Sequence, residues 1–70
     1  MIDFIIETLK KDAKNMREIA DDHRANAEQY ALAGEADTLV QAAKRCAKEY
    51  DEKSAQLTKA AEWLKNVSEV

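Results

Sequence analysis

The chain holds one histidine, His23, and one cysteine, Cys46, which are the side chains best suited to zinc binding or nucleophilic catalysis. A tetrahedral zinc site made from them would need both residues from two copies of the chain. Zinc motifs have closely paired ligands, and these two residues lie far apart in the sequence. A catalytic Cys–His pair also needs a pocket and a third group that orients the histidine. We therefore expect no catalytic residue, metal or cofactor, with His23 at the edge of the core and Cys46 as a small core hydrophobe.

Apolar residues recur three and four positions apart along both halves of the chain. The row in the first half consists of Ile6, Leu9, Ala13, Met16, Ala20, His23, Ala27 and Tyr30. The row in the second half consists of Ala36, Leu39, Ala43, Cys46, Tyr50, Lys53, Leu57, Ala60, Leu64 and Val67. A mean spacing of about 3.5 residues is typical of coiled-coil helices packed against helices.

Gly34 is the only glycine, and the chain has no proline. Most other positions hold strong helix formers, so the sequence predicts helix along nearly its whole length. A glycine just past a helix accepts the left-handed conformation that ends it. The sequence therefore predicts one all-α domain over residues 1–70, an antiparallel helical hairpin of two long helices with its turn near Gly34.

Folding the chain back at Gly34 aligns residues whose numbers sum to about 69 or 70. This register predicts that Ala13 lies opposite Leu57, Ala20 opposite Tyr50 and His23 opposite Cys46. Polar residues interrupt the apolar surface at Asp12, Asn26 and Lys53. Such residues commonly set register and oligomeric state, which we favour over a polar site inside the bundle.

The charge pattern gives no general attraction to nucleic acid or to an anionic membrane. The formal net charge is −3, from 14 acidic and 11 basic residues. The N-terminal segment lacks the basic start and long apolar stretch of a signal peptide, and no segment has the length of a membrane span. Together with a single cysteine, these features favour a cytoplasmic location without membrane contact.

The apolar surface is wider than one partner helix covers. The residues beside the two rows are Ile5, Ile19, Val40, Ala47, Ala61 and Trp63. A homodimer that forms a four-helix bundle would cover them. Such a dimer is similar in general plan to the plasmid RNA-regulating protein Rop, a likeness of length and heptads without a shared motif.

Exposed apolar residues predict a site for another protein, formed by Phe4, Ile5, Ile19 and Trp63. Aromatic side chains dominate the binding free energy at many protein interfaces. The alternative is that these side chains pack on one another or inside the dimer. On the first interpretation the chain is a non-enzymatic protein-binding module: an adaptor, a chaperone-like factor or an inhibitor of a larger protein.

Basic residues near the middle of the hairpin suggest a second interpretation, in which the chain is a Rop-like regulator that binds RNA or DNA. The residues are Arg17, Arg24, Lys44, Arg45 and Lys48. Acidic residues lie among them at Glu28, Glu49, Asp51 and Glu52. We therefore favour a solvated face with ion pairs, and we expect a protein partner rather than a nucleic acid.

Overall fold

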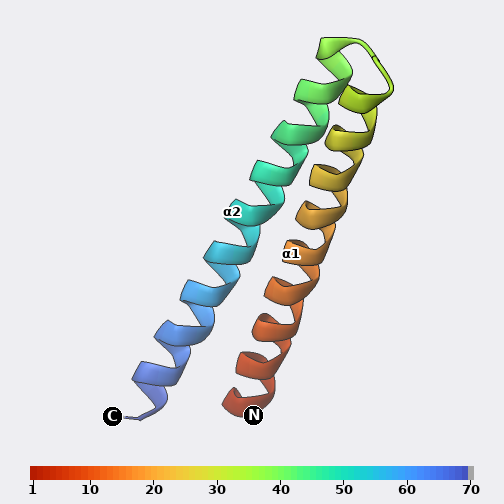
Figure 1. The fold of residues 1–70 in the computed structure, drawn as a ribbon. Coiled ribbons are helices and arrows are strands. Elements are labelled where there is room, and N and C mark those ends of the chain that lie inside the picture. Colours follow the sequence, from red (N-terminus) through yellow and green to blue (C-terminus); the bar gives the residue numbers. More distant parts are fainter. Residues whose placement is uncertain (70) are drawn as a thin grey trace.

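The computed structural model describes residues 1–69, which form two long antiparallel helices (Figure 1). Helix α1 spans Ile2–Leu32 and helix α2 spans Asp37–Ser68. The start of α1 and the end of α2 lie at one end of the molecule, which we call the open end, and the connection lies at the other (Figure 1). The Cα trace measures 54 × 13 × 11 Å, so the molecule is a rod. The predicted all-α antiparallel hairpin is confirmed.

Gly34 reverses the chain, as predicted. Its φ of 74° lies in the left-handed region, which glycine enters without the steric cost of a Cβ. The Gly34 amide donates to the Ala31 carbonyl at 3.2 Å, and the Glu35 amide donates to the Tyr30 carbonyl at 2.9 Å. These two hydrogen bonds form a Schellman motif, which satisfies carbonyl groups at the end of α1.

Helix α2 begins without a side-chain cap. Its N-cap residue, Ala36, has an extended backbone (φ −55°, ψ 140°) but no side-chain oxygen that can accept a hydrogen bond. Asp37 lies in the first turn, where its negative charge interacts favourably with the helix dipole. The start of α2 therefore depends on the turn and the dipole rather than on capping.

The core between the helices is narrow and consists mainly of alanine. Its buried apolar residues are Ile6, Ala13, Ala20, Ala27, Val40, Ala43, Ala47 and Ala61. Ser54 is the one buried polar residue among residues 1–69, and no large side chain in that range is fully buried. Small side chains at the contact let two helices approach closely. The hairpin is therefore held by close backbone packing more than by large apolar side chains.

The apolar row predicted for α1 is confirmed. Its buried members are Ile6, Ala13, Ala20 and Ala27. Its half-buried members are Leu9, Met16, His23 and Tyr30. Positions seven residues apart therefore keep the same environment along the whole helix, as in a coiled coil.

The row predicted for α2 is wrong at half of its ten positions. The members that lie in or beside the core are Ala43, Cys46, Tyr50, Leu57 and Leu64. The members that are exposed are Ala36, Leu39, Lys53, Ala60 and Val67. The centre of the contact is formed instead by Val40, Ala47, Ser54 and Ala61, which were predicted to lie beside the row or were not predicted at all. The reason is steric, because the alanines of α1 bring the backbones together and leave room only for short side chains.

Two contacts fix the register of the helices. The Ser54 hydroxyl donates to the Ala13 carbonyl at 2.8 Å, and Ala27 packs in one cluster with Val40 and Ala43. The seven-residue repeat between these contacts places Ala20 opposite Ala47. The predicted partners Tyr50 and Leu57 lie one helical turn along α2 from Ala47 and Ser54, as Ala43 lies one turn from Val40. The offset from the predicted register is therefore small, because Ala27 packs with Ala43, a pair whose numbers sum to 70, as well as with Val40.

Candidate interaction surfaces

His23 and Cys46 are both half-buried, and His23 contacts an aromatic side chain of the other helix. The His23 ring stacks on the Tyr50 ring, with 5.7 Å between centroids and 17° between planes. The Lys53 ammonium lies 4.8 Å from the centroid of the Tyr50 ring. No group of three His, Cys, Asp or Glu side chains in residues 1–69 is placed to hold a metal ion. His23 is thus a packing residue that joins the two helices.

Large apolar side chains gather at the open end. The exposed ones there are Met1, Ile2, Phe4, Ile5, Trp63 and Val67. Among residues 1–69, the two others that are exposed are Leu32 and Leu39, which flank the turn at the opposite end. The open end therefore carries most of the exposed large apolar side chains of residues 1–69.

Phe4 and Trp63 remain in solvent at this end. Phe4 is 74% exposed and lines a shallow depression on α1 with Glu7, Thr8 and Lys11. Trp63 projects from α2 and is 64% exposed. The one stacked ring pair among residues 1–69 is His23–Tyr50, so Phe4 and Trp63 do not stack on each other. Two aromatic rings therefore stand free at the open end.

Ile19 lies apart from the other residues predicted for protein binding. It is half-buried near the middle of α1, two heptads from Ile5 and on the same side of the helix. The structure thus brings Phe4, Ile5 and Trp63 to one end of the rod and leaves Ile19 along its side.

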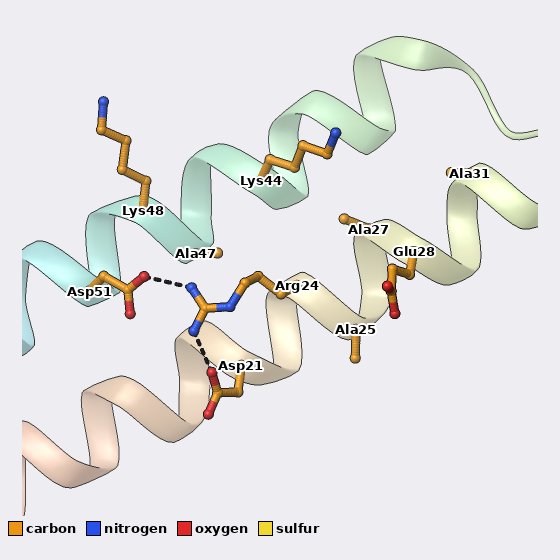
Figure 2. Close-up of a pocket in the computed structure, with 10 residues that line it drawn as sticks. All are labelled: Asp21, Arg24, Ala25, Ala27, Glu28, Ala31, Lys44, Ala47, Lys48 and Asp51. Carbon is orange, nitrogen blue, oxygen red and sulfur yellow. Dashed lines mark hydrogen bonds and ion pairs between the residues drawn. The ribbon is translucent and has the colours of Figure 1, made fainter.

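A groove between the helices holds three of the five basic residues predicted for nucleic-acid binding (Figure 2). Arg24, Lys44 and Lys48 line it, and Arg17 does not. Arg45 lies midway between the buried Ala43 and Ala47, so it projects from the opposite side of α2. The basic residues therefore do not form one continuous patch.

Carboxylates neutralise this groove. Arg24 Nη1 donates to Asp51 Oδ2 at 2.5 Å, and Arg24 Nη2 donates to Asp21 (Figure 2). The hydrogen bond to Asp51, followed by the one to Asp21, raises the pKa of Arg24 above its ordinary value. With Glu28, the groove has as many acidic as basic side chains. A nucleic-acid phosphate would have to compete with two carboxylates to reach Arg24.

Sequence reasoning missed the ion pairs of Arg24 and the buried hydroxyl of Ser54. Asp21 precedes Arg24 by three residues, a spacing at which helical side chains meet, so this signal was present. Asp51 is 27 residues away, and its contact depends on the register. Ser54 lies seven residues from Ala47 and from Ala61, so this repeat of small residues could have predicted that Ser54 is buried.

Searches against protein-family models, curated proteins and solved structures gave no match to this chain. Along residues 1–69, neither helix contains a stretch long and apolar enough to cross a bilayer. The hairpin thus has three distinct surfaces: the open end, the charged groove and the side that carries the His23–Tyr50 stack.

Proposed function

We propose that the chain is a non-enzymatic protein-binding module that serves a larger protein as an adaptor, a chaperone-like factor or an inhibitor. The observation that carries this proposal is the exposure of Phe4, Ile5 and Trp63 at the open end. Burying a large apolar side chain stabilises a complex by about 1.5–3 kcal/mol. Three such side chains on one end of a rigid rod are a good basis for helix–helix recognition.

The anchoring of these side chains also supports binding. Ile5 extends from the first turns of α1, and Trp63 extends from the last turns of α2. Because both helices are regular there, the backbone needs little further ordering when a partner binds, which lowers the entropic cost of association. Phe4 on the outer side of α1 widens the surface that one partner can reach.

Nucleic-acid binding through the groove has weaker support, because Arg24 is already paired with Asp21 and Asp51. The two functions differ in their response to salt. Binding to phosphates weakens steeply as salt rises, whereas burial of apolar side chains does not.

Affinity capture with variants of the chain tests the proposal. The bait proteins are the wild type, Phe4→Ala, Trp63→Ala and, as a matched control, Leu32→Ala, which removes an exposed leucine at the opposite end. We expect a protein that survives a high-salt wash on the wild type and on Leu32→Ala but is lost from both aromatic variants. Equal retention by all four baits would refute the open end as the binding site. Capture of nucleic acid alone, released by salt, would favour the groove.

A further inference from the structure

The line of contact between the helices divides the hairpin into two sides. One side carries the Arg24–Asp51 ion pair, and the other carries the His23–Tyr50 stack. We call the side with the ring stack the lateral face. Because residues seven apart share a stripe on packed helices, the rows that form this face can be followed along the whole rod.

The lateral face is apolar along its length. Nearest the contact line are large half-buried side chains, among them Leu9, Met16, Tyr50, Leu57 and Leu64. Further out lie apolar residues that include Ile5, Ile19, Leu39, Cys46 and Val67. This face is distinct from the charged groove. At the open end it includes Ile5, so whatever covers the face also covers Ile5 and leaves Phe4 and Trp63 for the partner proposed above.

The core inside one hairpin is too small to account for a stable fold by itself. In the described part of the chain, six of the eight buried apolar residues are alanines, and the larger side chains keep part of their surface in water. Chains of about this length usually need a second source of stability, such as association, because they bury too little apolar surface alone. Covering the lateral face would bury the half-exposed leucines, methionine and tyrosine together.

The size of the lateral face matches that of a stable interface. The two longer dimensions of the rod, 54 and 13 Å, give about 700 Å² per copy before side chains are added. Stable complexes bury about 800 Å² per partner. A rod of equal length covers the face completely, and a second copy of the chain has that length.

The charges on the face suit contact with a second copy. Asp12 and Lys53 are the charged residues in these rows, and their charges are opposite. A two-fold contact sets the same face against itself, so a net charge of zero avoids repulsion. Ser54 contacts Ala13, so the adjoining Lys53 and Asp12 lie within about one helical turn of each other along the rod.

We propose that a second copy of this chain covers the lateral face, related by a two-fold axis parallel to the helices. In this arrangement α1 of each copy packs antiparallel to α2 of the other, and the open ends of both copies coincide. The outer row with Asp12 then faces the outer row with Lys53 of the partner subunit, and the pair forms twice. The large half-buried side chains fill the centre of the four-helix bundle.

A two-fold axis perpendicular to the helices fits the charges less well. It would pair α2 with α2 about its midpoint, which lies at residues 52–53 of Asp37–Ser68. The two copies of Lys53 would then meet, and Asp12 would face an uncharged part of the row that contains Ile19 and Asn26. Like charges at an interface oppose association.

Sedimentation equilibrium of charge-reversed variants tests the contact. Asp12→Lys makes the face purely basic and Lys53→Asp makes it purely acidic. We expect each variant alone to self-associate at least about tenfold more weakly than the wild type, and an equimolar mixture to form a heterodimer of wild-type affinity. Glu18→Lys and Arg45→Asp, on the outer sides of the two helices, are controls that should leave self-association unchanged. A wild type that stays monomeric throughout the micromolar range would overturn the proposal.

The mixture also tests the proposed contact if each variant alone fails to fold. Folding restored by mixing supports the interface, whereas a mixture that stays unfolded or monomeric contradicts it.

Pulsed electron spin resonance tests the direction of the two-fold axis. The spin label is attached to the new cysteine of the double variant Cys46→Ala/Glu35→Cys, at the turn. If the turns of the two copies lie at the same end of the bundle, the two spin labels should be less than about 30 Å apart, since packed helix axes lie about 10 Å apart. A distance near the 54 Å length of the rod would overturn the parallel axis.

Discussion

Replacement of Ala20 by leucine should destabilise the hairpin by about 1–3 kcal/mol. Ala20 has no exposed surface, and the register places it opposite Ala47, which is 2% exposed. At this level each helix presents only a methyl group, so three added carbons fit only if the helices separate. Leucine and alanine differ little in helix propensity, so the expected loss is a packing effect.

The loss is large relative to what a small domain can tolerate. With a urea m-value of about 1 kcal/mol per molar, the unfolding midpoint should fall by about 1–3 M. The melting temperature should fall by about 4–8 °C for each kcal/mol. Separation of the helices at Ala20 would also lengthen the Arg24–Asp51 ion pair one turn away on α1.

Urea unfolding followed by circular dichroism measures the effect, with all variants at one protein concentration because association contributes to stability. Ala25→Leu is the matched control on the same helix. Ala25 is exposed and its side chain is directed away from α2 (Figure 2), so the same change there should alter the free energy of unfolding by no more than about 0.5 kcal/mol. Equal midpoints for the two variants would refute the alanine contact line and the register derived from it.

Three further substitutions test the turn and the core, each by thermal or urea unfolding at fixed concentration. Gly34→Ala should cost about 1–2 kcal/mol through the positive φ alone, since no heavy atom lies within 4 Å of the added Cβ; an unchanged midpoint would contradict the left-handed turn. Ala36→Ser should stabilise by about 1 kcal/mol by capping α2, and a loss of stability would show that the helix starts elsewhere. Ser54→Ala should destabilise by less than about 1 kcal/mol, because loss of the hydrogen bond to Ala13 is partly offset by the better helix propensity of alanine; a loss of several kcal/mol would reveal a further role for the hydroxyl.

The sequence was sufficient to predict the hairpin because its signals are local. A single glycine at position 34 marks the turn, and the spacing of apolar residues marks the inner side of α1. For α2 the spacing allowed two rows, one through Leu39 and Val67 and the other through Val40 and Ser54. Hydropathy favours the first row, but the structure has the second, because short side chains are required where two helices meet along alanine.

The charged groove shows a second limit of sequence reasoning. Arg24 and Lys44, two of the basic residues predicted to gather near the middle of the hairpin, both line the groove. Whether Arg24 is free to bind phosphate depends on Asp51, which reaches it only in the register that the structure has. Exposed carboxylates are frequent in both helices, so the sequence alone does not distinguish the one that pairs.

The cluster of Ala27, Tyr30, Val40 and Ala43 beside the turn has a consequence for how the hairpin assembles. Contact between Ala27 and Val40 closes a short loop, whereas contact between Ala13 and Ser54 closes a much longer one. The entropic cost of closing a loop rises with its length, so we expect contacts between the helices to form first at the turn and then successively toward the termini.

Local opening should follow the reverse path. Backbone amides near Ile5 and Trp63 are then expected to exchange with deuterium faster than those near Ala27, because the contacts at the open end close the longest loops. A partner bound to the open end would hold together the part of the hairpin that separates most easily. Binding of a partner there should therefore slow the deuterium exchange of backbone amides at the open end and leave exchange near the turn unchanged.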